Sequence, residues 1–266
     1  MKKTFVAAAI SAAFVSVPAM AAIVGGINLP TPVPIFEATT VYENVVNIGG
    51  IPSLAPGATI DGYGIVNQIN GISNFCVGGF GTCELTYRFG GFVLKPGATP
   101  SVLDFTGGWV DFYVATGAQV NFNPFASVGQ AQDIADATDG TLWLSLTGHT
   151  FLDLLSGRTG TLLSTGTNLG SGTDAGTGIG QLNVVSGLAA AYLDTNTVSD
   201  HLGGYADLDL TSSFSVVGAP PHGQTPLAGV VSLAGRSQNV PEPELISLLG
   251  IGALGLGFAA RRKAAK

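Results

Sequence analysis

The sequence predicts an all-β protein, an antiparallel β-sandwich or jelly roll, with an amino-terminal signal peptide and a single carboxyl-terminal transmembrane helix. Short runs of alternating apolar and polar residues recur along the chain, and glycine- and proline-containing turns separate them. Helical patterns are confined to two brief stretches, 130–137 and 151–155. Such a succession of short strands and turns is typical of two-layered antiparallel folds.

Residues 1–21 have the organisation of a secretory signal peptide. Met1-Lys2-Lys3 is basic, Thr4–Val17 is mostly apolar, and Ala19-Met20-Ala21 is a small-x-small cleavage site. We expect cleavage after Ala21 and export of the mature protein. The alternative is a second, uncut anchor, which the short apolar run and the clear cleavage site disfavour.

The expected exported domain spans residues 22–218, and a linker at 219–239 leads to the last segment, 240–266. Residues 22–239 contain four basic and fifteen acidic residues, a formal net charge of −11. Binding to nucleic acid or to anionic lipid surfaces requires clusters of Lys and Arg, so this charge balance argues against both. It suits a solvated extracellular protein.

Strands are expected wherever the alternation is clear, and a loop where glycine, threonine and serine dominate. Leu85, Tyr87 and Phe89 alternate with polar neighbours, as on a half-buried strand. The expected strands are 37–47, 59–69, 83–95, 109–114, 142–146 and 205–217, with a small apolar segment at 184–192. Residues 22–34 are expected to be an irregular lead-in, and 157–180 a loop.

Cys76 and Cys83 are the only two cysteines, and a glycine-rich stretch separates them. The exported compartment is oxidising, which favours a disulfide across a hairpin. The alternative is a redox or metal pair, but two thiols with no nearby histidine make a poor zinc site.

Trp109, Asp111 and Tyr113 lie on one side of an alternating strand. Two aromatic side chains with a carboxylate between them could contact a glycan. The alternative is ordinary packing in the core or at an edge.

Asp133, Asp136 and Asp139 recur at three-residue spacing before Gly140. Carboxylate oxygens are the ligands that Ca²⁺ prefers, but calcium loops alternate their ligands at two-residue spacing. The sequence therefore leaves two interpretations, a Ca²⁺ site and a solvated acidic loop or helix face.

No residue pattern in the sequence indicates a catalytic site. The three histidines lie in turns or beside a single carboxylate, and the nucleophile-elbow, zinc-protease and phosphate-loop motifs are missing from the sequence. We therefore expect no enzymatic activity.

The last segment has three blocks that follow one another. Pro241-Glu242-Pro243 cannot lie inside a helix, and Leu245–Ala260 is a run of sixteen residues without charge. Arg261, Arg262 and Lys263 end the run. An apolar stretch followed by a basic cluster is typical of a membrane anchor, although a helix of this length spans about 24 Å of a hydrocarbon core of roughly 30 Å. Snorkelling arginines and local thinning can meet the shortfall; the alternative is a buried core helix.

This segment resembles the PEP-CTERM sorting signal of Gram-negative bacteria in the order and position of its blocks. The resemblance implies that an exosortase recognises the protein near Pro241-Glu242-Pro243 and releases it from a transient inner-membrane anchor at 245–260. The cell surface or the extracellular matrix is then the expected destination.

Three shorter stretches of the exported domain, at 62–64, 83–87 and 191–197, resemble flocculation-associated PEP-CTERM proteins. That resemblance implies a secreted matrix protein that promotes flocculation or biofilm formation together with exopolysaccharide. The alternative function is a secreted hydrolase acting on polysaccharide, which would need two carboxylates in a cleft.

Overall fold

The computed structural model describes residues 22–30, 32–46, 55–123, 129–168, 175–216 and 227–237. It confirms the all-β, antiparallel class. The predicted signal peptide, the apolar run at 245–260 and the proline and arginine residues of the last segment lie outside the described residues. None of the described helices is long and apolar enough to cross a membrane.

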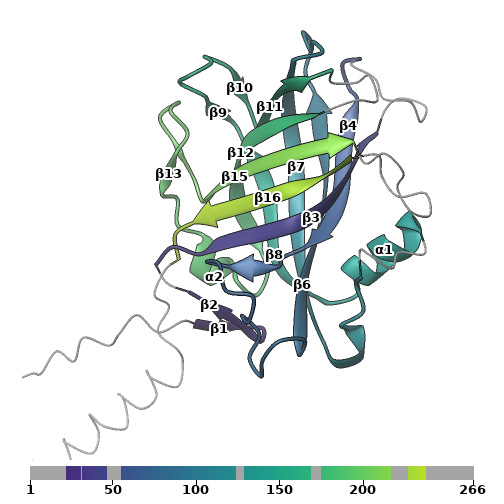
Figure 1. Cartoon of the computed structure of the whole chain (residues 1–266). Coiled ribbons are helices and arrows are strands. Elements are labelled where there is room, and N and C mark those ends of the chain that lie inside the picture. Colours follow the sequence, from purple (N-terminus) through teal and green to yellow (C-terminus); the bar gives the residue numbers. More distant parts are fainter. Residues whose placement is uncertain are drawn as a thin grey trace, which may run out of the picture.

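Figure 1 labels most of the helices and strands. In chain order, the elements are β1 (Ala22–Val24), β2 (Ile27–Leu29), β3 (Ile35–Val46), β4 (Thr59–Ile65), β5 (Gln68–Ile69), β6 (Cys83–Leu94), β7 (Val102–Thr116), a 3₁₀ turn (Gly117–Gln119), α1 (Gln130–Ala137), β8 (Thr141–His149), β9 (Phe151–Leu152), β10 (Thr159–Gly160), β11 (Leu162–Thr167), β12 (Ala175–Ser186), α2 (Ala190–Leu193), β13 (Val198–Ser199), β14 (Tyr205–Ala206), β15 (Leu208–Val216) and β16 (Leu227–Gly235).

The main sheet has ten strands and closes on itself. Its path runs β11-β12-β15-β16-β3-β4-β6-β7-β8, and further pairings join β7 to β11 and β8 to β12. Strands β8 and β11 therefore lie end to end in the same position, between β7 and β12. The two sheets expected of a sandwich are thus joined into one, and this sheet forms a closed cylinder with a lumen (Figure 1).

The lumen holds most of the hydrophobic core. Tyr87 and Phe89 on β6 and Val110 and Phe112 on β7 are buried there. The expected alternation on β7 is confirmed. On β6, Leu85, Tyr87 and Phe89 are buried as expected, but Glu84 and Thr86 between them are buried as well, so this part of the strand is covered on both faces. A smaller apolar cluster lies outside the sheet, where α1 covers Tyr63.

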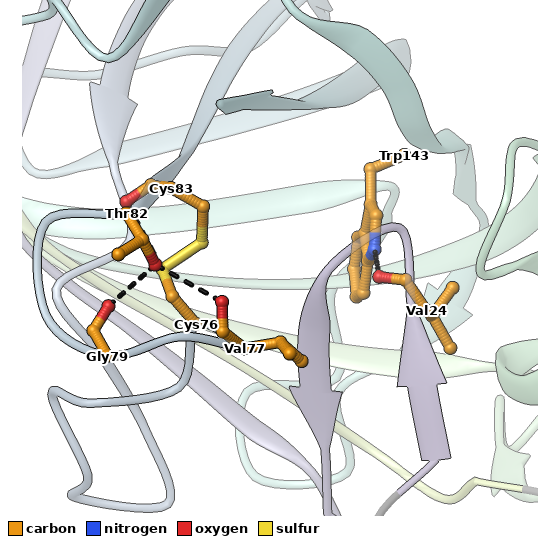
Figure 2. Close-up of a disulfide and its surroundings, with 7 residues drawn as sticks. All are labelled: Val24, Cys76, Val77, Gly79, Thr82, Cys83 and Trp143. Atoms are coloured by element: carbon orange, nitrogen blue, oxygen red, sulfur yellow. Dashed lines mark hydrogen bonds between the residues drawn. A yellow bond between two sulfur atoms is a disulfide. The ribbon is translucent and has the colours of Figure 1, made fainter. Parts of the chain in front are cut away.

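The β1–β2 hairpin closes one end of the cylinder. It lies below the sheet in Figure 1, at the end away from β9 and β10. Val24, Ile27 and Leu29 are buried in the main core, and the indole nitrogen of Trp143 donates a hydrogen bond to the carbonyl oxygen of Val24 (Figure 2). The expectation of an irregular lead-in at 22–34 is therefore wrong.

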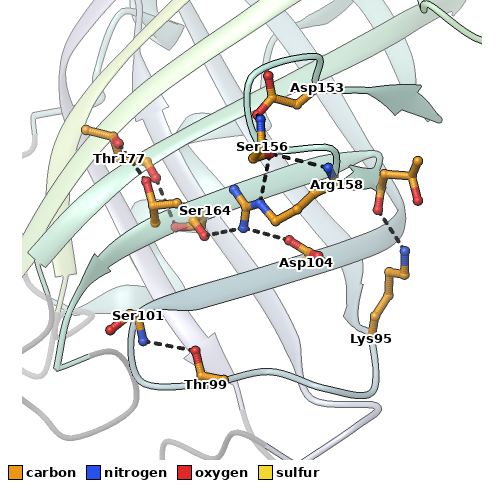
Figure 3. A network of polar contacts seen from close by, with 11 residues as sticks. Lys95, Thr99, Ser101, Asp104, Asp153, Ser156, Arg158, Ser164 and Thr177 are labelled. Carbon is orange, nitrogen blue, oxygen red and sulfur yellow. Dashed lines mark hydrogen bonds and ion pairs between the residues drawn. The ribbon is translucent and has the colours of Figure 1, made fainter.

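A polar network joins strands at the other end of the cylinder (Figure 3). The Arg158 guanidinium donates to Asp104 Oδ1 at 2.8 Å and to the carbonyl oxygen of Ser164 at 3.1 Å. Lys95 Nζ donates to the carbonyl oxygen of Thr159 at 2.7 Å. These contacts tie β7 to β11 and to the segment that leads into it.

Three further segments differ from the sequence expectation. Residues 157–180 contain β10, β11 and the start of β12, and their glycines allow close strand approach: a Cβ on Gly176 would lie 2.3 Å from the carbonyl oxygen of Thr165. The expected linker at 219–239 contains β16, which pairs with both β15 and β3. The expected short helix at 151–155 begins instead as β9, while the helix at 130–137 is confirmed.

Candidate functional site

The outer face of β6, β7 and β8 carries an unusual group of side chains. The strand register places Arg88 opposite Asp111, and Asp111 opposite Ser145. Because neighbours along a strand point to opposite faces, the burial of Phe89, Val110 and Phe112 in the lumen turns the residues between them outward. We call Arg88, Trp109, Asp111 and Tyr113 the outer platform.

Trp109 lies over a glycine pair on the neighbouring strand. A Cβ on Gly90 would come within 3.1 Å of the indole ring, and one on Gly91 within 3.0 Å. The Arg88 guanidinium carbon lies over the ring at 5.9 Å from its centroid, a cation–π arrangement. The indole is therefore held by backbone on β6 and by the guanidinium, and it stays half-exposed.

Two carboxylates belong to the same face. Asp111 Oδ1 accepts a hydrogen bond of 2.6 Å from the Ser145 hydroxyl. Burial raises the pKa of Asp61 on β4, and the nearby Arg88 guanidinium opposes that rise. Asp61 Oδ1 is buried and has no hydrogen-bond partner among the described residues.

Tyr113 completes the platform. Burial, and then the charge of Asp111, raise the pKa of its phenol. The structure thus brings the predicted residues Trp109, Asp111 and Tyr113 onto one face. It adds Arg88 and Asp61, which no local sequence pattern indicates, because only the pairing of distant strands places them beside Trp109.

The structure does not bring the three aspartates of the predicted Ca²⁺ site together. Asp133 is buried and accepts a hydrogen bond of 2.9 Å from the Tyr63 hydroxyl, while Asp136 accepts one from Gln132 and Asp139 one from Asn121. Across the described ranges, no group of three or more His, Cys, Asp or Glu side chains is placed to hold a metal ion. Helical spacing directs Asp133 toward the sheet, where it anchors α1.

Glu84 is a buried carboxyl beneath the segment that leads to α1. Burial raises its pKa from 4.5 to about 7, although the backbone amides of Asn121 and Phe122 act in the opposite direction. The amide of Phe122 donates to Glu84 Oε2 at 3.2 Å. Glu84 does not stand out in the sequence, because no local pattern shows that the outer face of β6 is covered here.

Cys76 and Cys83 form the predicted disulfide, with their Cα atoms 5.7 Å apart. Thr82 on the connecting turn donates to the carbonyl oxygens of Val77 and Gly79 (Figure 2). Ile27 of β2 forms an isolated β-bridge with Cys76, so the disulfide also secures the hairpin that closes the cylinder.

The histidines form no catalytic arrangement with a nucleophile within the described residues. His149 Nε2 lies 3.1 Å from Asp200 Oδ2, and the amides of Leu202 and Gly204 also donate to this carboxylate. Together with the histidine, these amides lower the pKa of Asp200 to about 2, with the Leu202 amide first in effect. Such a carboxylate stabilises a turn.

A polar groove of about 510 Å³ lies near His201 and Arg236. Gln181 and Asp209 also line it, and the Gln181 amide donates to Asp209 Oδ1 at 3.2 Å. Asp209 is the one carboxylate among the described lining residues. The two-carboxylate arrangement of a glycoside hydrolase is therefore not found among them.

Comparison with protein families identifies the last segment. Residues 239–263 match the PEP-CTERM protein-sorting motif. No curated protein and no solved structure matches the chain. The motif implies an exosortase as processing partner, with export and transient membrane anchoring before release. The chain therefore carries a PEP-CTERM sorting motif, and this motif implies an exosortase-sorted extracellular protein.

Proposed function

We propose that the exported domain is a non-enzymatic component of the cell surface or extracellular matrix. In this role it binds exopolysaccharide through the outer platform and so promotes cell aggregation, as in a floc or biofilm. The observation that carries the proposal is the half-exposed Trp109–Arg88 pair, flanked by carboxylates on a rigid sheet.

The chemistry of the platform suits a sugar. An aromatic ring offers an apolar surface to the C–H groups of a pyranose, and charged side chains form strong hydrogen bonds with its hydroxyls. Arg88 supplies donors, while Asp61 and Asp111 supply acceptors on either side of it. A site with one cation and two carboxylates favours hydroxyl-rich sugars over strongly anionic ones, because the domain as a whole is acidic.

Rigidity also supports the proposal. Trp109 rests on the backbone of β6, and Asp111 is held by Ser145, so little side-chain freedom remains to be lost on binding. Many copies along a polysaccharide would further convert weak single contacts into strong attachment.

The test compares two double variants in a strain that lacks the native gene. Arg88→Gln/Tyr113→Ser alters the platform, and Arg236→Gln/Tyr205→Ser makes the same chemical changes elsewhere. Tyr205 is 56% exposed, and Arg236 is exposed as well. The platform variant should bind the strain's purified exopolysaccharide roughly tenfold more weakly, as expected for about 1.4 kcal/mol of lost contact, and should fail to restore aggregation.

The control variant should bind and aggregate like the wild type, and both variants should keep the wild-type melting temperature to within a few degrees. If both variants bound the exopolysaccharide equally well, the outer platform would not be the binding site. Weaker binding by the control alone would move the site to the polar groove. Release of reducing ends from the polysaccharide, abolished by Asp61→Asn or Asp111→Asn, would replace adhesion by hydrolysis.

A further inference from the structure

The lumen of the closed sheet contains an apolar cavity of about 80 Å³. Aromatic rings form much of its wall, among them Phe36, Phe89, Phe105 and Phe112. Ser164 and Ser212 place hydroxyls on the wall. The Ser164 hydroxyl donates to the carbonyl oxygen of Thr177 at 3.1 Å, so that donor is already engaged.

The cavity has a structural origin in the pairing of the strands. Ser164 pairs with Gly178, Gly178 with Ser212, Ser212 with Val231, and Val231 with Ala38. All five residues line the cavity. Small side chains across neighbouring strands therefore leave space opposite the phenylalanines, where larger residues would fill the lumen.

Only a small or slender molecule could occupy this space. Closed antiparallel sheets of about eight strands have interiors that side chains fill or that hold one small ligand. Apolar cavities of about 150 Å³ stay dry and accept apolar molecules, because water finds too few hydrogen-bond partners in them. A hydrocarbon suits the walls better than water does.

The shape favours a chain over a round molecule. The lining extends along β15 from Leu210 to Phe214, a rise of roughly 13 Å along the strand. It also extends along β6 from Tyr87 to Phe92. A volume this small, distributed over such a length, makes a narrow channel.

One end of the channel is closed and the other is more exposed. The β1–β2 hairpin packs into the core at one end. Along β15, Leu208 is 0% exposed, whereas Leu210, Ser212 and Phe214 are partly exposed although they all line the lumen. Near that end, at the level of Leu163 and Ser164, the Arg158–Asp104 pair joins β7 to the segment that leads into β11 (Figure 3).

We propose that the lumen binds one unbranched hydrocarbon chain of a single-chain amphiphile, with the polar head at the Phe214 end. The chain is either that of a free fatty acid or that of a lipid with one acyl chain; both present the same hydrocarbon to the walls. This binding site lies on the opposite side of the sheet from the outer platform and does not depend on the proposed adhesion.

The test uses the exported, processed protein and a matched pair of variants on β15. Ser212→Leu adds a side chain inside the lumen, and Ser213→Leu adds the same side chain on the exposed face of the same strand. Binding of octanoic, dodecanoic and hexadecanoic acids and of a lysophosphatidylcholine is measured by calorimetry. Wild type and Ser213→Leu should bind with an affinity that rises with chain length until the channel is full. Ser212→Leu should bind at least tenfold more weakly.

A second lumen variant, a comparison of the ligands and a control on the outer platform complete the test. If Ser212→Leu does not fold, Ala38→Leu narrows the same row from β3 and should cause the same loss. Binding of the fatty acids but not of the lysophospholipid would identify the free acid as the source of the chain. The Arg88→Gln/Tyr113→Ser platform variant should keep its chain binding. The proposal would be overturned if the wild type bound none of the chains, or if Ser212→Leu and Ser213→Leu bound them equally well. It would also be overturned if the wild type and all variants attached to vesicles of a diacyl phospholipid, since that would indicate general membrane binding.

Discussion

The indole nitrogen of Trp143 donates a hydrogen bond of 2.8 Å to the carbonyl oxygen of Val24, which lies 119 positions earlier in the chain. Trp143 is fully buried, and its ring meets that of Phe36 edge to face at 5.7 Å between centroids. Through this contact the β1–β2 hairpin becomes part of the core and closes the lumen.

Replacing Trp143 should therefore cost more than replacing the other tryptophan. Trp143→Phe removes the donor, leaves the buried Val24 carbonyl without its partner and opens a small void, which should lower the free energy of unfolding by about 2–4 kcal/mol. Trp109→Phe, at a half-exposed position, should cost about 1 kcal/mol or less. Urea unfolding of both variants measures the difference, and equal losses would contradict the role of this hydrogen bond.

Gly108 should tolerate no side chain. Its φ is +93°, and a Cβ would lie 2.3 Å from the Phe92 ring. Gly108→Ala adds this clash to backbone strain and should destabilise by about 2–4 kcal/mol. Gly26 has a similar φ of +87° with nothing within 4 Å of a Cβ, so Gly26→Ala should show the strain alone, about 1 kcal/mol. Thermal unfolding separates the two, and similar losses would mean that Phe92 moves aside easily.

Stability should depend on pH through Glu84. Its pKa is raised in the folded state from 4.5 to about 7, so the folded protein holds this proton more tightly than the unfolded chain does. Below about pH 4.5, Glu84 is protonated in both states, and the free energy of unfolding does not change with pH through this residue. Between about pH 4.5 and 7 the free energy of unfolding falls, and above pH 7 it stays at the lower value. Compared with Glu84→Gln, the wild type should lose about 1–2 kcal/mol across this interval, since solvent and the two amides offset part of the burial.

Denaturant titrations at pH 4.5, 6 and 8 measure the Glu84 effect. Glu37→Gln removes the same charge from β3, and its amide oxygen can still accept the hydrogen bond that the Gly71 amide donates to Glu37 Oε2, so this variant serves as the control for net charge. If the free energies of unfolding of wild type and Glu84→Gln differed by the same amount at all three pH values, the carboxyl would ionise as freely in the folded protein as in the unfolded chain.

The Cys76–Cys83 disulfide should stabilise the exported domain without affecting its sorting. Cys76→Ser/Cys83→Ser should lower the free energy of unfolding by about 2 kcal/mol, because the bond closes only a short loop. Thiol labelling of the native, unreduced protein should find no reactive cysteine. Two labelled thiols per chain would contradict the bond.

Release from the membrane should require Pro241-Glu242-Pro243. In a host with an exosortase, replacing these residues by three alanines should leave the protein in the inner membrane, because the recognition segment is lost while the apolar run remains. Intact-mass analysis of the extracellular protein should show that the wild type has lost its last segment. A secreted wild-type protein that still ends in the Arg261–Lys266 segment would contradict processing.

Local sequence patterns predicted those strands and helices in which buried and exposed positions alternate regularly along the chain. On β6, the burial of Leu85, Tyr87 and Phe89 follows from simple alternation, and α1 occupies the predicted residues 130–137. The strand β16 was missed because its residues are small and lie near prolines and glycines. What makes it a strand is pairing with β15 and with β3, and β3 begins almost two hundred positions earlier.

The sequence by itself determined the sorting motif, the antiparallel class and the disulfide. Each of these depends on residues that are close together, so their spacing alone carries the information. Only the tertiary structure decided that the sheet closes, that Arg88 covers Trp109, and that Ala38, Ser164 and Ser212 lie around one lumen. These relationships depend on the register of strands from distant parts of the chain. The packing of the whole domain selects that register, because a shift of one residue would turn every side chain to the opposite face.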